Sequence, residues 1–551
     1  MFHVELFFYI IKMKISGNIF DVINKEIYKG SIIIKRGLIE DIVREDNESD
    51  IYIMPGLVDS HVHIESSMLV PSAFAVAAVR HGTVTVVSDP HEIANVMGIE
   101  GVDFMIQNAK EVPLKFYFGA PSCVPATDLE SSGAVLDVSD IKELLSRREV
   151  KYLSEMMNFP GVIGNDTKVI AKINAARERG KPVDGHAPGL TGDKLKKYIN
   201  AGISTDHECI NIEEAREKIR SGMMVQIREG SAARSLDSFH YLLAEEPDML
   251  MLCSDDLHPE MLNRGHINVL VERLMAMGYD IMDIMKIVTV NPVKHYGLET
   301  GLLRKGDPAD FIIIDNTHTF NIRETWIDGV KVYDGKRVLF SPEKVEPINN
   351  FHSSHIKPED IAVRRTGDNI RVIKAVDGEL ITGSYEWDVS GLGEYVNCDP
   401  AEDILKIVVK DRYKDLPPAT AFVRGFGISR GAFASSVAHD SHNIIAVGAD
   451  DDSICRAINR IVDEKGGLVV YYDDICQSLP LKVAGIMSDV PCGTIANQYE
   501  ELSEIVKNMG CQLKSPFMTL SFMALLVIPD LKISDKGLFD VNKFELVDLF
   551  F

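Results

Sequence analysis

The sequence predicts an α/β protein built on a (β/α)8 TIM barrel, with a β-sandwich flanking the barrel and an α+β domain after it. Strand-like apolar runs alternate with helical patterns over roughly 200 residues, close to the length of such a barrel. Residues with metal-binding side chains stand at the ends of several of these runs, where a barrel has its mouth. A doubly wound sheet is the alternative fold, but its Gly-x-Gly-x-x-Gly turn is missing.

The first predicted strand lies in the stretch 54–65, an apolar run that ends in His61-Val62-His63. Because alternate residues of a strand point to the same face, the two imidazoles share one side. Neutral imidazole is a common ligand of transition metals, so we infer a metal at this strand end. For the motif taken alone, two satisfied polar residues on a half-exposed strand are the alternative.

Seven further strands follow in order. A helix is expected from Pro71 to Gly82, since proline suits a first turn and glycine a helix end, and another helical pattern covers 166–179. The run 83–88 is rich in β-branched residues and predicts the second strand. The remaining strands are expected near residues 114–118, 151–156, 182–186, 204–207, 223–227 and 249–253.

Two segments on either side of the barrel region share a β-rich pattern. Residues 1–53 alternate short apolar runs with turns, and a similar pattern returns at 300–345. We expect both to form one small β-sandwich domain beside a catalytic barrel of residues 54–299. The apolar opening, residues 1–11, is too short to span a bilayer, and we interpret it as an edge strand or an extension ahead of a second start at Met13.

The pattern changes in residues 351–551, where strands mix with helices and predict a separate α+β domain. One helix there carries Ile454, Ile458 and Ile461 on a single face and ends before Gly466.

Composition limits the partners. The net charge of −24 argues against nucleic acid or an anionic membrane, which both attract basic surfaces, and favours a small neutral or cationic substrate. The eight cysteines are scattered without a Cys-x-x-Cys pair, so we expect neither a zinc ribbon nor a disulfide framework, and a cytoplasmic location fits best. The oligomeric state stays open, a homo-oligomer being one option.

Six residues with metal-binding side chains fall at predicted strand ends and should meet at the barrel mouth. They are His61 and His63 on the first strand, Glu155 on the fourth, His186 on the fifth, His207 on the sixth and Asp255 on the eighth. Four imidazoles and two carboxylates exceed one tetrahedral site but suit two metals that share Glu155 and a hydroxide. The nitrogen and oxygen ligands exclude a thiolate-preferring site and leave Zn, Mn and Fe open.

Several motifs together resemble the amidohydrolase superfamily and, within it, the adenine deaminase family. The superfamily motifs are Pro55 to His63 and Gly306 to Asp310, and the more specific ones cover residues 63–67, 88–95, 155–158, 254–259 and 439–443. The resemblance extends over nearly the whole chain. Many relatives bridge their metals with a carboxylated lysine on the fourth strand, whereas Glu155 stands here, which argues against a hydantoinase or dihydroorotase.

The resemblance implies hydrolytic deamination of adenine to hypoxanthine and ammonia. Hydroxide would attack purine C6, and Asp255 would pass the proton to the departing amine. The implied ligands are His61, His63, Glu155 and Asp255 for one metal and Glu155, His186 and His207 for the other, with Mn²⁺ or Fe²⁺ favoured over Zn²⁺. Candidates for contacts with the ring nitrogens are Glu65, His91, Glu92 and Asp256, each of which could instead support a metal ligand.

Two other functions are weighed against this one. Another amidohydrolase could act on a different aminated heterocycle or a cyclic amide, and a barrel without catalysis is opposed by the presence of all six ligand-type residues. The pair His439 and His442 could form a third metal site, a lid over the mouth or an ordinary polar loop, and we favour the lid or the loop.

Overall fold

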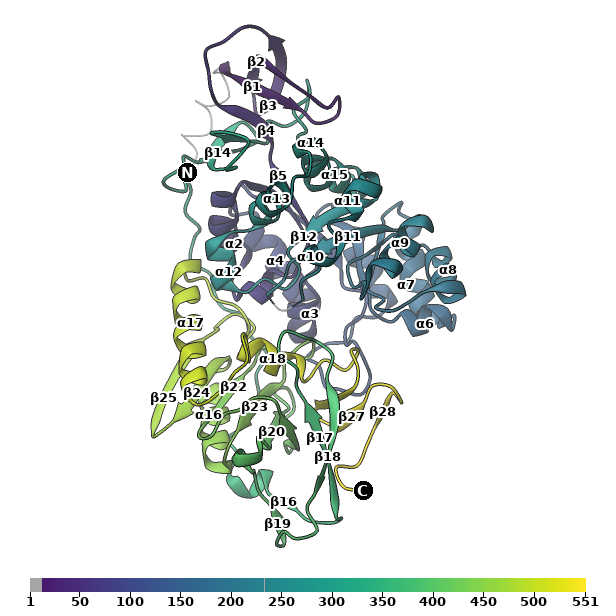
Figure 1. Cartoon of the computed structure of the whole chain (residues 1–551), viewed down its shortest axis with the longest axis vertical. Helices are drawn as coiled ribbons and strands as arrows, with labels where there is room; N and C mark the ends of the chain where they lie inside the picture. The colour runs from purple at the N-terminus through teal and green to yellow at the C-terminus, as the bar shows by residue number, and fades with distance from the viewer. Residues whose placement is uncertain (1–11, 232) are drawn as a thin grey trace.

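The computed structural model describes residues 12–231 and 233–551. Three units follow one another along its longest axis: a β-sheet, the barrel and the C-terminal domain (Figure 1). The expectation for residues 1–11 falls outside the described residues. Among the helices of the described part, none combines the length and apolar character needed to cross a membrane.

Eight parallel strands form the barrel, in the order that the sequence predicts. They are β5 (Leu57–Val62), β6 (Thr83–Ser88), β7 (Lys115–Ala120), β8 (Val150–Met156), β9 (Val183–Gly185), β10 (Thr205–Asp206), β11 (Met224–Arg228) and β12 (Leu250–Cys253). β5 to β9 pair in sequence, as do β10 to β12. Parallel bridges from Val183 to Ile203 and from Val62 to Asp255 join the two sets and close the ring, so the predicted (β/α)8 barrel is confirmed.

Helices alternate with these strands and cover the barrel (Figure 1). They are α2 (Pro71–Ala78), α3 (His91–Met97), α4 (Ile99–Ala109), α5 (Val138–Leu144), α6 (Phe159–Ile163), α7 (Thr167–Arg177), α8 (Gly192–Ala201), α9 (Ile212–Arg220), α10 (Leu236–Phe239), α11 (Leu242–Glu245), α12 (Pro259–Arg264), α13 (Ile267–Ala276), α14 (Ile281–Met285) and α15 (Asn291–Tyr296). α2 begins at Pro71, and the 3-10 turn that continues it stops at Gly82, whose φ of 81° favours glycine. The carboxylate of Asp166 caps α7 by accepting from the backbone N–H groups of Lys168 and Val169 at 2.9 and 3.0 Å.

The two β-rich segments combine into one unit, as expected, and its strands are hydrogen-bonded in a seven-stranded sheet that folds over a core of its own, in which Ile34, Phe311 and Trp326 belong to one buried cluster. The order is β15 (Val330–Tyr333), β14 (Ile322–Ile327), β13 (Phe311–Ile314), β4 (Tyr52–Pro55), β1 (Met13–Asp21), β2 (Glu26–Lys35) and β3 (Leu38–Arg44). β4 joins the two segments, because it pairs with β1 on one side and with β13 on the other. Gly56, directly after β4, leads the chain into the barrel.

The C-terminal domain is organised around an eight-stranded mixed sheet. Its order is β18 (Gly383–Asp388), β17 (Asn369–Lys374), β21 (Ala419–Arg424), β20 (Leu405–Lys410), β23 (Ile444–Gly448), β22 (Ala432–Ser435), β24 (Gly467–Tyr472) and β25 (Ile475–Pro480). Two small sheets lie beside it, one of β16 (Val363–Arg364) and β19 (Tyr395–Val396), the other of β26 (Leu531–Ser534), β27 (Gly537–Asp540) and β28 (Glu545–Leu546). Along β20, Val408 packs with helix α16 (Asp451–Glu464), whereas the neighbouring Ile407 and Val409 belong to the core shared with the barrel and with helices α17 (Cys492–Asn508) and α18 (Pro516–Phe522).

The C-terminal domain lies against the mouth side of the barrel. The backbone N–H of Val70, shortly after β5, donates to the carbonyl of Ser488 at 3.0 Å, and the N–H of Ser488 donates to the carbonyl of Met68 at 2.8 Å. The amide of Asn443 donates to the carbonyl of Ser131 at 2.8 Å. These contacts join the domain to segments that follow barrel strands at their carboxyl ends.

A fully buried lysine on α9 stabilises the end of β10. The Nζ atom of Lys218 donates to Asp206 at 3.1 Å, to the carbonyl of Ala187 at 2.8 Å and also to Glu214. Burial alone would raise the pKa of Asp206, but the charge of Lys218 lowers it. Since Asp206 directly precedes His207, this pair holds a strand end that the site uses.

We expect Lys218→Met to lower the thermal unfolding midpoint markedly, because it leaves two buried carboxylates without their cation. Loss of one partner of a buried ion pair costs about 3–5 kcal/mol. The matched control is Lys196→Met, which removes an exposed pair with Asp193 and should leave the midpoint near that of the wild type. Equal midpoints for the two variants in calorimetry would contradict this role of Lys218.

Candidate metal centre and active site

All six residues predicted as metal ligands lie together at the barrel mouth, and each is at most 7% exposed. His61 lies in β5, with His63 just beyond it, Glu155 lies in β8, His186 and His207 follow β9 and β10, and Asp255 follows β12. The carboxyl ends of parallel barrel strands converge, which brings residues from five strands to one place.

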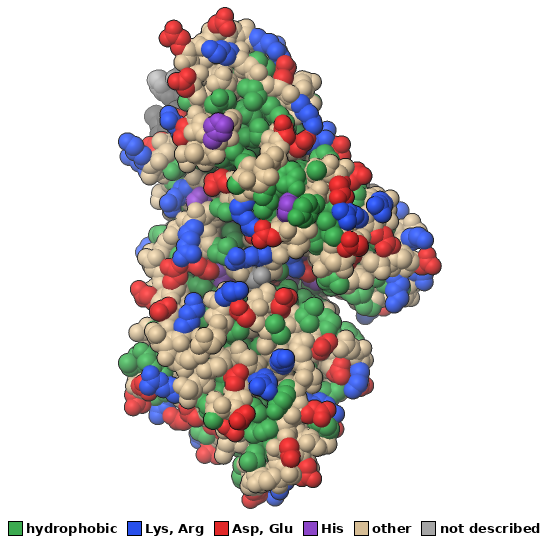
Figure 2. Space-filling model, in the orientation of Figure 1, with side chains coloured by type: hydrophobic (Ala, Val, Ile, Leu, Met, Phe, Trp, Pro, Cys, Tyr) green, Lys and Arg blue, Asp and Glu red, His purple; other side chains and the backbone are tan. Residues whose placement is uncertain are grey.

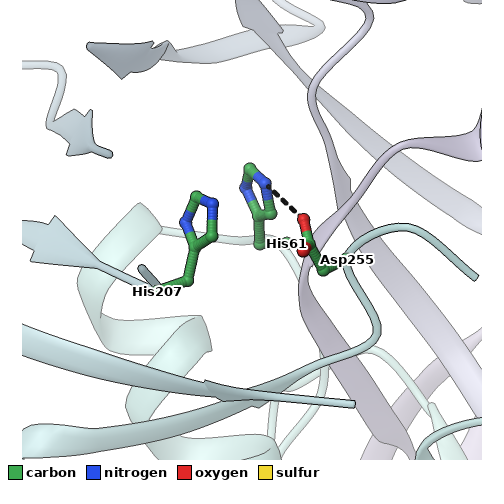
Figure 3. A group of neighbouring side chains, drawn as sticks. All are labelled: His61, His207 and Asp255. Carbon is green, nitrogen blue, oxygen red and sulfur yellow. Dashed lines mark ion pairs between the residues drawn. The ribbon is translucent and has the colours of Figure 1, made fainter. Parts of the chain in front are cut away.

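The first group of ligand atoms is built on the His-x-His motif. The Nε2 atoms of His61 and His63 lie 3.1 Å apart, and Asp255 Oδ1 is 3.5 and 3.4 Å from them. Glu155 approaches the same two nitrogens at 3.9 Å. The close approach of His61 to Asp255 is drawn as a dashed line in Figure 3.

The second group shares Glu155 with the first. Glu155 Oε2 lies 3.1 Å from His186 Nδ1 and 3.0 Å from His207 Nε2. The rings of His61 and His207 stack with centroids 4.3 Å apart, so the two groups are adjacent (Figure 3). The carboxylate of Glu155 therefore stands between four imidazoles.

The backbone conformation of Asp255 turns its carboxylate into this cluster. Its φ of 53° lies in the left-handed region, which is uncommon outside glycine. Its N–H donates to the carbonyl of His61 at 3.0 Å, and its own carbonyl accepts from the N–H of His63 at 3.4 Å. Pairing with β5 thus holds a strained residue at the position where the ligand atoms meet.

Hydrogen bonds around the cluster indicate that it fits a cation. His63 Nδ1 lies 3.2 Å from the carbonyl oxygen of Asp89, so this nitrogen carries a ring proton. Burial alone would lower the pKa of His63, but Asp255 and the neighbouring carboxylates raise it well above its usual range, so without a cation Nε2 holds a proton toward Asp255 Oδ1. A bound divalent cation would replace that proton and face the same nitrogen and oxygen atoms. The cluster therefore has the donor set of a divalent metal site.

Burial and neighbouring charges set the protonation of each group in the cluster. Burial alone would lower the pKa of His63, His186 and His207, but neighbouring carboxylates raise it, to about 9 for His207, so a bound cation would take the place of their protons. Burial, together with the neighbouring His207, lowers the pKa of His61 to about 3, so this ring is neutral at pH 7. Burial alone would raise the pKa of Asp255, but the guanidinium of Arg228, 2.8 Å from Oδ2, helps to lower it well below its usual range. Arg228 also binds both oxygens of Glu208.

The four residues predicted to contact substrate lie in different surroundings. Asp256 lines the cavity above the cluster and accepts from Ser66 Oγ at 2.5 Å. The ring of His91 lies between Asp89 and Glu155, with Nδ1 at 3.3 and 3.5 Å from their carboxylates.

The remaining two of these residues have carboxylates engaged with protein groups. One oxygen of Glu65 accepts from the N–H of Ile93 at 3.1 Å, and burial raises the pKa of Glu65 to about 7. Both oxygens of Glu92 contact histidines of the C-terminal domain, Oε1 with His439 and Oε2 with His442. Glu65 and Glu92 therefore both hold neighbouring protein groups in place.

Sequence reasoning missed several residues in and around the cavity. Arg228 ends β11 and Glu208 directly follows His207, so their positions at strand ends could have marked both. The C-terminal domain contributes Leu380, Asp440, Phe522, Leu525 and Ile528. No local pattern marks this second set, because its contacts with the cavity form only when distant segments pack together.

The barrel and the paired clusters at its mouth define the class of protein. Residues 52–332 match the model described as the amidohydrolase family. That match covers the sheet strands next to the barrel as well as the barrel itself, which is the arrangement described above.

The rest of the chain allows a more specific family assignment. Residues 379–545 match the model described as the adenine deaminase C-terminal domain. An adenine deaminase of Methanosarcina mazei is 52% identical over 552 residues, which cover 98% of this chain and 99% of that protein. Those of Salinibacter ruber and Borreliella burgdorferi are 49% and 48% identical, each over 97% of this chain and at least 98% of their own length. The chain belongs to the adenine deaminase family of the amidohydrolases.

We expect Glu155→Ala to lose both metal ions, because this carboxylate belongs to both groups of ligand atoms. His207→Ala should weaken the binding of one ion only. Metal analysis after dialysis checks this, with Asp256→Asn as the control that removes a mouth carboxylate outside both groups. Two ions per chain in the Glu155 variant would contradict the bridging role.

Proposed function

We propose that this protein hydrolyses adenine to hypoxanthine and ammonia with two divalent cations, Mn²⁺ or Fe²⁺ being favoured. The observation that carries the proposal is the similarity to adenine deaminases over the full chain, including the C-terminal domain. Because it extends beyond the barrel, this similarity favours adenine over a cyclic amide or a different aminated heterocycle.

The six clustered residues would hold the cations, with Glu155 shared between both. Two cations held there would lower the pKa of a water molecule and supply a nucleophile at neutral pH. The chemistry left to the chain is to move two protons. Water adds to C6 of the base and the C6–NH2 bond breaks, so one proton of the water molecule goes to ring N1 and the other to the departing amine.

Asp255 would carry the proton that goes to the amine. Its Oδ1 faces the ligand cluster, while Oδ2 is held by Arg228 at 2.8 Å, so the carboxylate keeps one oxygen directed at the reacting atoms. The nearby guanidinium keeps Asp255 ionised and therefore able to accept the proton before passing it to the amine.

The C-terminal domain would exclude water from this reaction. Leu380, Phe522 and Leu525 line the cavity opposite the ligand cluster. An apolar cover of this kind strengthens the electrostatic interactions beneath it and protects the reacting groups from bulk water.

The proposals about binding partners and cellular location rest on the amino-acid composition. A net charge of −24 supports a small-molecule substrate over nucleic acid. On the face shown in Figure 2, acidic and basic side chains lie interspersed over all three units. A cytoplasmic location is supported by the scattered cysteines, and a homo-oligomer remains one option.

We expect turnover of free adenine and little turnover of adenosine. The C-terminal residues that cap the mouth would have to move to admit a ribose on the base. Ammonia release from both compounds, measured on metal-replete protein, checks this expectation. Comparable catalytic efficiency on the nucleoside would rule out the proposed selectivity for the base.

We also expect Asp255→Asn to fold, to keep much of its metal and to lose turnover by roughly 10²–10⁴-fold, the usual contribution of general acid–base catalysis. The amide keeps the size and one oxygen of the side chain but cannot accept the proton, so the loss should lie mainly in kcat.

The matched control is the neighbouring residue. Asp256→Asn should be milder, because Asp256 lies outside both groups of ligand atoms. A near wild-type rate for Asp255→Asn together with an inactive Asp256→Asn would show that Asp256, and not Asp255, transfers the proton.

A further inference from the structure

Two histidines of the C-terminal domain contact one carboxylate of the barrel, yet only one of them reaches the cavity. His439 and His442 lie in the loop between β22 and β23, and both bind Glu92 of α3. All three side chains are at most 3% exposed. His439 lines the cavity above the ligand cluster, together with Glu155 and Asp255.

Both ring nitrogens of His442 are used within the protein. The backbone N–H of Ala438 donates to His442 Nδ1 at 3.2 Å, so this nitrogen has no proton. The proton is then on Nε2, which donates to Glu92. Both ring nitrogens of His442 thus have partners within the protein, which indicates a structural contact between the domains.

His439 uses only one ring nitrogen. Its Nδ1 donates to Glu92, whereas its Nε2 is buried and has no hydrogen-bond partner among the residues that the structure describes. Buried polar atoms in native proteins are nearly always paired, so an unpaired nitrogen in the wall of a reaction cavity points to a ligand atom as its partner.

The ring of His439 is fixed from three sides. Phe522 stacks on it with centroids 4.9 Å apart and an interplanar angle of 16°. The backbone N–H of His439 donates to Ser521 Oγ at 3.3 Å, and Glu92 holds Nδ1. These contacts set the direction of Nε2 before any ligand enters, which lowers the cost of ordering it on binding.

We propose that His439, oriented by Glu92, binds the heterocycle through a hydrogen bond from its Nε2 to a ring nitrogen of the base. Glu92 is then a positioning residue that acts through His439. The inference rests on the proposed deamination for the identity of the heterocycle. It assigns to the C-terminal domain a direct contact with substrate in addition to the cover it provides.

The charge on His439 agrees with a donor role. Burial alone would lower the pKa of His439, but the charges of Glu92 and Asp256 raise it to about 9, so Nε2 carries a proton at neutral pH. The unsubstituted ring nitrogens of adenine are acceptors, and a charged donor is worth more to them than a neutral one.

Two substitutions at this position separate the two nitrogens. Asn places its amide nitrogen near the position of Nδ1, so His439→Asn keeps a donor for Glu92 and removes the group that enters the cavity. Gln places its amide nitrogen near Nε2, so His439→Gln keeps a donor in the cavity. We expect His439→Asn to bind adenine-like ligands roughly 10–100-fold more weakly, as for loss of a hydrogen bond from a charged group, with a smaller loss for His439→Gln.

The experiment measures dissociation constants by calorimetry for the 1-deaza, 3-deaza and 7-deaza analogues of adenine, on metal-replete wild type and variants. For the analogue that lacks the partner nitrogen, His439→Asn should leave the dissociation constant unchanged, because the hydrogen bond is already absent. For the other two analogues, the substitution should weaken binding by the full factor expected for adenine-like ligands. The metal content should stay at the wild-type level, and His442→Gln should preserve the wild-type pattern among the analogues.

An equal loss for all three analogues, or wild-type affinity for all of them in His439→Asn, would overturn the contact. Wild-type turnover of adenine is measured separately. If the wild type shows the expected differences in affinity among the analogues but releases no ammonia from adenine, the proposed reaction is wrong and the proposed contact of His439 is still supported.

Discussion

The carboxylate of Glu155 is the point on which the rest of the site depends. Four imidazoles of the ligand cluster lie within 3.9 Å of it, and His91 approaches at 3.5 Å. Burial alone would raise the pKa of Glu155, but the neighbouring His186 and His207 lower it well below its usual range. An ionised carboxylate this deep is stable only if every strand end around it stays in register, because each displaced partner would leave a buried charge unpaired.

Two further acidic side chains beneath the mouth each have a hydrogen-bond partner. Asp59 accepts from the N–H of Ser254 at 3.0 Å, and Asp184 accepts from Tyr296 Oη at 2.7 Å. Asp59 and Asp184 precede His61 and His186 by two residues, so a strand places each aspartate on the same side as its histidine. The supporting partners therefore order the ligands through the strands as well as through direct contacts.

The parts of the site that the sequence predicts are those encoded over a few residues. The His-x-His strand and the polar residues at later strand ends carry their own spacing, and a parallel barrel brings such ends together whatever its loops do. The strand order of the β-unit illustrates the opposite case. Its two segments have a clear strand pattern and are expected to combine, but the pairing of β4 with both β1 and β13 has no signal in local periodicity.

The C-terminal wall of the cavity shows why a second domain is needed at all. A ligand cluster at an open barrel mouth would face water, which weakens every interaction on which its charges depend. Phe522 and Leu525 supply apolar cover, but an apolar cover alone offers no hydrogen bond to orient a heterocycle. Glu92 connects the cover over the mouth with a group that can orient a ligand, because this one barrel carboxylate binds both His439 and His442. Because Glu92 directly follows His91, which approaches Glu155 at 3.5 Å, the contact that docks the domain is built next to the cluster that it covers. Any shift of the domain on the barrel would therefore change the cavity wall and the surroundings of Glu155 together.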